Sequence, residues 1–421
     1  MSDVTDEQPA PDQERDPFAA FDAAAGVGQV DDIHPVFHEM RAECPVHTGS
    51  FAHRFGIEDP FGGALAGDGP TPYAVLSFDA VQQALKDGAT FSSAGYADTI
   101  GLLMGHSILE MDEPEHHRYR SLLQQAFTRK AMDRWEADLV VPVVDGLIGR
   151  FVEQGRADLV KELFFPFPVT VIAGMLGLPA DDLDEFHRKA VELITIISDI
   201  ETGLEASVWL HDYFSRIISE RRAGDGQGQD MISVLTRAEL DGQRLDDEEI
   251  IAFLRLLLPA GAETTYRSAS NLMFGLLSHP DQLEALRADR ALMPQAIEEG
   301  IRWEPPLTGI GRTATRDVEV AGVTIPAGSP VAVEMGAANR DPARWDRPDE
   351  FDIFREPQQH MGFAFGVHMC LGIHLARMET TVVISAVLDR LPNVRLDPEA
   401  ENVRISGLAF RAPPALPVLF G

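Results

Sequence analysis

FAFGVHMCLGIHLAR at residues 363–377 is the stretch from which the fold of this chain can be deduced. It places Cys370, one of only two cysteines, directly before an amphipathic helical pattern. The first N–H groups of a helix lack internal acceptors, and the helix dipole is positive at that end. A sulfur at this position is therefore predicted to have a lowered pKa and to be held as a thiolate. Gly366 and Gly372 allow the backbone to approach a flat partner closely and to turn tightly, and Phe363 can form one wall.

Two simpler explanations of Cys370 remain open at this point. A lone cysteine is most often a small buried hydrophobe. It could also be a nucleophile with His368 as its base. Neither explanation accounts for the spacing of the aromatic residue, the two glycines and the histidine. A single thiolate without other sulfur nearby fits iron that is already held by a porphyrin better than it fits zinc.

The pattern FxxGxHxCxG resembles the haem-binding loop of the cytochrome P-450 family, with Phe363, Gly366, His368, Cys370 and Gly372 at its fixed positions. The resemblance extends over nearly the whole chain after the first thirty residues, and it implies that Cys370 is the ligand of the iron of haem b. It implies a mostly α fold with a minor β portion (α+β), a single helical prism around a buried haem. We expect residues 18–421 to form this domain, after an acidic, disordered tail over residues 1–17.

The overall charge limits the choice of partners. The 421 residues include 67 acidic and 35 basic side chains, which gives a net charge of −32. Such a surface repels nucleic acids and anionic lipid. Two cysteines are too few for a disulfide scaffold, and neither a secretory signal nor a long apolar run is apparent. The sequence therefore predicts a soluble, cytoplasmic, monomeric protein without a membrane anchor.

Helical periodicity dominates the central part of the chain. It predicts helices over 32–44, 77–87, most of 114–223, 280–288 and 293–303, and from Cys370 to Leu391. The longest helix is predicted from Asp246, in a capping box with Glu249, to about Ser278. Short strands are predicted near Val46 and over 73–76, 318–323 and 330–334, with a mobile loop over 88–107.

Glu299 and Arg302 match the ExxR motif of the family on one helix face. Such pairs are usually solvated, but the resemblance implies a buried pair that locks the cysteine loop. The family often completes this network with an arginine, at a position where this chain has Glu350. Arg344, Arg347 and Arg355 are the possible substitutes.

Haem carries two propionates, which need cationic or hydrogen-bonding partners. In MDEPEHHRYR (111–120), His116 and Arg120 resemble the HxxxR motif of the family. Arg312 and His368 match two further propionate contacts. The alternative is that these side chains are simply solvated.

The segment from Ala260 to Thr265 lies in the middle of the longest predicted helix. A threonine there can bond back to the carbonyl one turn earlier, Gly261 weakens the same turn, and Pro259 removes a helical hydrogen bond. The resemblance implies that Ala260 and Gly261 lie against the haem as an oxygen groove. In that groove Glu263 would relay protons and Thr264 would position oxygen for O–O cleavage. Without the cysteine loop, a packing seam of small residues is the better explanation.

The resemblance implies a monooxygenase that uses O₂ and receives electrons from a ferredoxin and a ferredoxin reductase. Members of the family that use peroxide have an Arg-Pro pairing in place of the acid–alcohol pair. Ferredoxins are acidic, so a local basic patch is expected, with Arg129, Lys130 and Arg377 as candidates. A medium-sized hydrophobic substrate of terpenoid, steroid or fatty-acid type is expected to contact Leu102, Met104, Leu256, Pro259, Leu307, Ile310, Ala409 and Phe410.

Two alternative functions remain. The same haem could serve a peroxygenase, an isomerase or a dehydratase. The chain could also be a non-catalytic haem-binding sensor. Loss of coupling in Thr264→Ala and a substrate-induced spin shift would separate these alternatives from O₂ activation.

Overall fold

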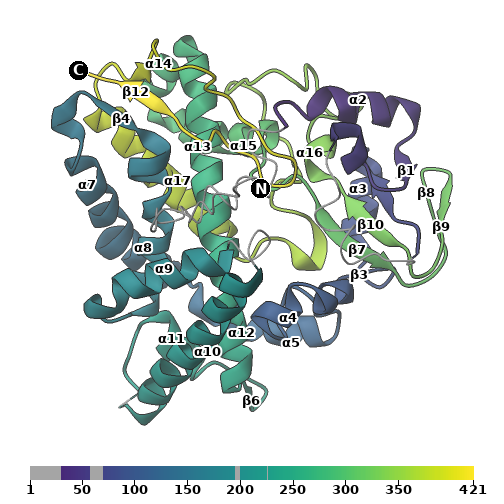
Figure 1. The fold of residues 1–421 in the computed structure, drawn as a ribbon, viewed down its shortest axis with the longest axis horizontal. Helices are drawn as coiled ribbons and strands as arrows, with labels where there is room; N and C mark the ends of the chain where they lie inside the picture. The colour runs from purple at the N-terminus through teal and green to yellow at the C-terminus, as the bar shows by residue number, and fades with distance from the viewer. Residues whose placement is uncertain (1–29, 57–69, 195–199, 225) are drawn as a thin grey trace, which may run out of the picture.

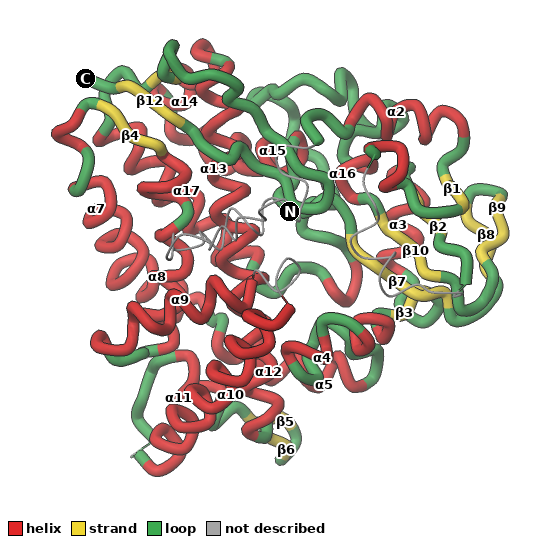
Figure 2. The backbone as a smooth tube through the Cα atoms, in the orientation of Figure 1, coloured by secondary structure: helices red, strands yellow, loops and turns green. Residues whose placement is uncertain are grey.

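A computed structural model describes residues 30–56, 70–194, 200–224 and 226–421, and helices make up most of them (Figures 1 and 2). The acidic tail predicted over 1–17 lies outside the described residues, and the single domain 18–421 stays a prediction. In the part of the chain that the structure describes, no helix combines the length and the apolar character needed to cross a bilayer.

The helices account for the predicted mostly α architecture. In chain order they are α2 (His34–Glu43), α3 (Phe78–Lys86), α4 (Gly101–Met104), α5 (Glu115–Leu123), α6 (Arg129–Trp135), α7 (Val141–Gly149), α8 (Pro166–Leu176), α9 (Leu183–Ile194), α10 (Ile200–Ala223), α11 (Met231–Leu235), α12 (Asp247–Leu258), α13 (Thr264–Ser278), α14 (Pro280–Ala288), α15 (Met293–Trp303), α16 (Met335–Ala338) and α17 (Ile373–Arg390).

The strands form the predicted minor β portion. A five-stranded sheet has the order β1 (Val46–Thr48), β2 (Tyr73–Val75), β10 (Pro330–Val333), β7 (Ile310–Ala314), β3 (Phe91–Ser92); only β2 and β10 are parallel. A three-stranded sheet has the order β11 (Arg395–Leu396), β12 (Pro417–Leu419), β4 (Arg156–Asp158). Two short hairpins complete the set, β5 (Glu239–Leu240) with β6 (Gln243–Arg244) and β8 (Val318–Val320) with β9 (Val323–Ile325).

The α13 helix runs through the middle of the molecule, between the helical side and the sheet side (Figure 1). It packs against α15 and α17, the helix that follows Cys370. The main apolar core fills the space among these helices, and a smaller core lies under the five-stranded sheet. The helices that carry Thr264, Glu299 and Arg302 therefore pack together with the helix that follows Cys370.

Most predicted elements are present, with two corrections. The capping box is confirmed, because Asp246 and Glu249 each accept the backbone N–H of the other at 2.8 and 2.9 Å. The single strand predicted over 318–323 is wrong: Ala321 and Gly322 have φ of 48° and 81° and turn the chain into the β8–β9 hairpin. The prediction that 88–107 holds no packed element is also wrong, because this segment contains β3 and α4.

A buried ion network around Glu304 joins distant parts of the chain. Its carboxylate contacts His34 of α2 at 3.0 Å, Arg340 at 3.0 Å and Arg411 near the C-terminus at 2.5 Å. Burial and the positive charge of Arg340 lower the pKa of His34 to about 4, so its ring is neutral at pH 7. Asp31 adds a backbone carbonyl that accepts from Arg411 at 3.0 Å.

Candidate active site

The loop before α17 presents Cys370. Its backbone N–H donates to the carbonyl of Phe363 at 3.0 Å, which closes the loop. Gly366 has φ of +76°, and a Cβ there would lie 2.4 Å from the carbonyl oxygen of Leu85. The backbone of Gly366 therefore approaches that of α3 closely, and its predicted approach to a flat partner stays a prediction. Gly372 caps α17 and has nothing within 4 Å of the position of a Cβ.

The surroundings of the Cys370 sulfur act on its pKa in opposite directions, and the iron-bound thiolate stays a prediction. Burial raises the pKa of the thiol, and this outweighs the N–H of Gly372 and the charges of Arg120 and Arg377. The helix begins three residues later, at Ile373, so its dipole acts from farther away than the sequence suggested. A metal ion at the sulfur would have to supply the remaining stabilisation of the thiolate.

Arg120 and Arg312 approach the loop from α5 and β7. Arg120 donates to the carbonyl of Met369 at 2.7 Å, and Arg312 donates to that of Gly311 at 2.7 Å. Among the described residues, neither guanidinium has a carboxylate within ion-pair distance, although Arg312 is only 7% exposed. Two cations without anions near one cysteine fit the two carboxylates of a haem.

Two histidines lie between these cations. The rings of His116 and His368 have centroids 4.1 Å apart, and Nε2 of His368 lies 3.2 Å from the hydroxyl of Ser93. Burial, with the positive charges of Arg312 and Arg120 nearby, lowers the pKa of His368 to about 3, so the ring is neutral. Nε2 of His116 is buried without a hydrogen-bond partner among the described residues. This orphaned nitrogen also fits a haem carboxylate.

The long helix is interrupted where the sequence placed the oxygen groove. Between α12 and α13, a π-helical segment, η9 (Pro259–Glu263), replaces α-helical hydrogen bonding. The Thr264 hydroxyl donates to the carbonyl of Ala260 at 2.8 Å, as its position in the helix predicted. Gly261 packs against Ile172 of α8, which would lie 3.1 Å from a Cβ.

The Glu299–Arg302 pair is buried and closely bonded. The two N–H groups of Arg302 meet the carboxylate oxygens at 2.7 and 2.8 Å, and Arg302 also donates to the carbonyls of Pro348 and Glu350. Arg355 approaches the same carboxylate at 3.3 Å. It therefore supplies the second cation of the network, which the family often places at the position of Glu350. Arg347 pairs with Glu350 at the surface instead.

The proposed substrate residues lie on several segments. Leu307 and Phe410 face each other in an isolated bridge, and the N–H of Thr308 donates to the carbonyl of Ala409 at 2.9 Å. Ile310 begins β7, and Leu256 and Pro259 lie on α12 and η9; all of these are partly buried. Met104 is 4% exposed, whereas Leu102 on the same helix is 74% exposed.

Sequence reasoning missed three groups near this site. Glu379 of α17 is fully buried; burial raises its pKa to about 8, against a hydrogen bond with the Thr265 side chain. The hydroxyl of Tyr96 accepts the N–H of Gly311 at 2.8 Å, beside Arg312. Arg267 of α13 pairs with Glu263, the last residue of η9. Only the i,i+4 spacing of Glu263 and Arg267 was visible in the sequence.

Comparison with known proteins supports the same assignment. The family model described as Cytochrome P450 matches residues 185–406. The cytochrome P450 monooxygenase PikC of Streptomyces venezuelae is 35% identical over 87% of this chain and 85% of its own length. A steroid C26-monooxygenase of Mycobacterium tuberculosis is 36% identical over 77% of this chain and 87% of its own length.

Solved structures agree with the fold. The crystal structure of CYP109E1 from Bacillus megaterium in complex with testosterone has a TM-score of 0.82 at 31% identity, covering 93% of this chain and 99% of that one. The shared fold, the cysteine loop and the levels of identity lead to one conclusion. This chain belongs to the cytochrome P450 family and is an oxidoreductase of the monooxygenase type.

Proposed function

We propose that this chain inserts one atom of O₂ into a C–H or C=C bond of a medium-sized apolar molecule and releases the other atom as water. The reaction consumes two electrons and two protons for each O₂. The observation that carries the proposal is the π-helical break at η9, with the hydroxyl of Thr264 directed to the carbonyl of Ala260 beside the buried carboxylate of Glu263. A helix with a purely structural role does not need this arrangement, which suits the binding of oxygen and the delivery of protons.

The cofactor in this proposal is haem b, with Cys370 as its axial ligand. When bound, it would supply the iron that activates O₂. Arg120 and Arg312 would hold its propionates, with His116 and neutral His368 as hydrogen-bond partners. The two cations without anions and the orphaned nitrogen of His116 support these roles.

Each polar group on the long helix has a distinct role in the proposal. Thr264 would donate a hydrogen bond from its hydroxyl to oxygen. The opened turn next to it would hold a water molecule. Glu263 would take protons from the solvent side and pass them toward Thr264. Ala260 and Gly261 would leave room for O₂ because they carry little or no side chain.

The substrate is proposed to be a steroid-like or terpenoid-like molecule. The side chains at Leu256, Leu307, Ile310 and Phe410 are apolar and only partly buried, which suits a hydrophobic occupant. Two of the similar proteins support this class: one is a steroid C26-monooxygenase, and the other was solved with testosterone. Leu102, exposed on α4, would contact a substrate on its way in rather than one already bound.

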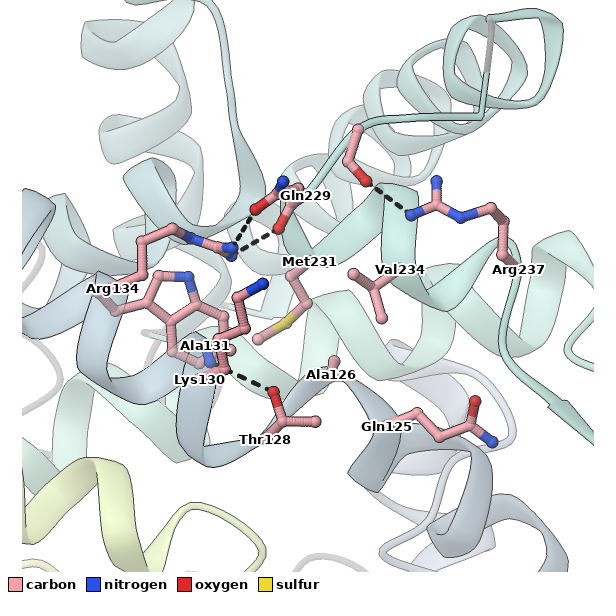
Figure 3. A pocket seen from close by; sticks show the side chains of 12 residues that line it. Gln125, Ala126, Thr128, Lys130, Ala131, Arg134, Gln229, Met231, Val234 and Arg237 are labelled. Carbon is pink, nitrogen blue, oxygen red and sulfur yellow. Dashed lines mark hydrogen bonds between the residues drawn. The ribbon is translucent and has the colours of Figure 1, made fainter.

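The electron donor is proposed to be an acidic ferredoxin, reduced by a ferredoxin reductase. Figure 3 shows a surface pocket between α6 and α11 with Lys130, Arg134 and Arg237 around it, and none of its 12 lining residues is acidic. Arg134 donates to the side chain and backbone oxygens of Gln229 at 2.7 Å, and Arg237 donates to the carbonyl of Gly228. Because these acceptors are neutral, the positive charges stay available for a partner.

Part of the pocket lining, from Gln125 to Trp135, follows α5 in the chain. Arg120 of α5 contacts the cysteine loop. Arg129 lies next to Lys130 on α6. Arg377 is a poorer candidate than the sequence suggested, because Glu298 binds it through two hydrogen bonds of 2.7 Å. The two unjoined cysteines fit the reducing cytoplasm proposed for the protein, and a monomer stays our expectation.

The experiment is a spectral titration of the ferric protein with testosterone and other apolar compounds, followed by turnover with NADH and a surrogate ferredoxin pair. A spin shift and product formation are expected. Thr264→Ala is expected to retain binding and NADH use but to release peroxide, with product reduced by about 10²-fold. Unchanged product formation in Thr264→Ala would point to a peroxygenase or isomerase instead. The absence of any spin shift and any turnover would leave a haem-binding sensor.

A further inference from the structure

Glu263, the acid of the proposed proton path, is held by the next turn of its own helix. Nε and Nη2 of Arg267 lie 2.6 and 2.5 Å from one carboxylate oxygen, and the Tyr266 hydroxyl donates to the same oxygen at 3.3 Å. Glu263 is 1% exposed and Arg267 0%. A cation at this distance stabilises the ionised form of a buried carboxylate.

Arg267 is fixed on its other side by aromatic rings. Its guanidinium carbon lies 4.9 Å from the ring centroid of Tyr266 and 5.8 Å from that of Phe410. These distances are within the range of cation–π attraction. Phe410 is the proposed substrate contact that faces Leu307, so one guanidinium spans the acid and the wall of the substrate site.

The residues on both sides of Phe410 are held by polar contacts. The carbonyl of Ala409 accepts from Thr308, and Arg411 is buried against Glu304. These contacts position Phe410 in the chain, with its ring next to the guanidinium of Arg267.

We propose that Arg267 is a positioning residue of the reaction, which holds the Glu263 carboxylate ionised and in place and connects it to the substrate wall through Phe410. The inference rests on the proposed function, because it assigns a purpose to Glu263. The inference concerns the ion pair of Glu263 and Arg267, so the state of the carboxylate can be measured in the protein without turnover.

The first test uses infrared spectra of the ferric holoprotein. Arg267→Gln removes the positive charge that lies against the buried carboxylate of Glu263, which favours the neutral acid. A band of a protonated carboxylic acid is expected in Arg267→Gln and not in the double variant Glu263→Gln/Arg267→Gln. Subtracting the two spectra removes the band of Glu379. Arg267→Lys keeps the charge and is expected to lack the band.

The second test measures product and peroxide per NADH with testosterone as the probe. Arg267→Gln is expected to reduce product per NADH about tenfold or more, with peroxide released instead. Arg267→Lys is expected to restore most of the coupling, which a merely structural role for the pair would not require. The double variant, which removes both charges of the pair, controls for folding.

The outcomes separate the inference from the proposed function. If the wild-type protein does not turn over, the monooxygenase proposal fails for this probe, and the infrared comparison still decides the role of Arg267. If Arg267→Gln lacks the carboxylic acid band, or couples as well as the wild type, Arg267 does not position Glu263.

Discussion

Two cysteines in different surroundings allow the sulfur ligand to be tested at the scale of single residues. Cys370 lies in the loop that Arg120 contacts, and Cys44 is the C-cap of α2. In the reduced protein under carbon monoxide, we expect a strongly red-shifted absorption band that requires an anionic sulfur ligand. Cys370→His should abolish this band, whereas Cys44→Ser should leave it unchanged. A red-shifted band in Cys370→His would exclude Cys370 as the ligand.

Glu379 gives the folded protein a dependence on pH. Its pKa is about 8 in the folded protein and near 4.5 when unfolded, so between these values the folded state binds the extra proton. The free energy of unfolding must therefore fall as pH rises through this range. The free energy of unfolding should fall less between about pH 6 and about pH 9 in Glu379→Gln than in the wild type, by up to a few kcal/mol. Urea unfolding at the two pH values measures this difference. Glu356→Gln, at an exposed position, should keep the slope of the wild type.

At the scale of elements, Arg355 ties the segment after Glu350 to α15. Its side chain is 9% exposed and lies 3.3 Å from Glu299, whereas that of Arg347 is 55% exposed. Arg355→Gln should lower the free energy of unfolding by about 1–3 kcal/mol, because Glu299 keeps only Arg302 as its ion-pair partner. Arg347→Gln should change it by less than about 0.5 kcal/mol. Equal effects in the two variants would mean that Arg355 does not complete the network.

The elements also show what a sequence can predict. The bounds of α14 and α15 were predicted to the residue. Pro280 marks the start of α14, and Trp303–Pro305 mark the end of α15. Local patterns located Thr264 and its bond to Ala260 as well. Arg355 could not be chosen over Arg344 or Arg347, since chain folding rather than spacing brings it to Glu299. The burial of Cys370 could not be judged from the sequence, because it depends on distant segments.

At the scale of the whole molecule, the net charge of −32 makes the cluster of Lys130, Arg134 and Arg237 around the surface pocket unusual. An acidic ferredoxin would be attracted to this cluster on an otherwise acidic surface. Salt screens that attraction, so the rate of association should fall as the salt concentration increases. Lys130→Glu/Arg237→Glu should slow electron transfer from ferredoxin about tenfold or more at low salt. Arg395→Glu, which reverses a charge on β11, is the matched control and should have a much smaller effect. A rate that is independent of salt and of both changes would place docking elsewhere.

The network around Glu304 has a consequence for how the protein is made. His34 is among the first described residues to leave the ribosome, and Arg411 is among the last. The ion network that fixes α2 therefore cannot close before Arg411 has been made. Before that point the apolar face of α2 can already pack on nearby residues, with Phe37 against Phe51 and Phe55. Apolar contacts close in sequence therefore form first, and the charged network completes the docking of α2 last.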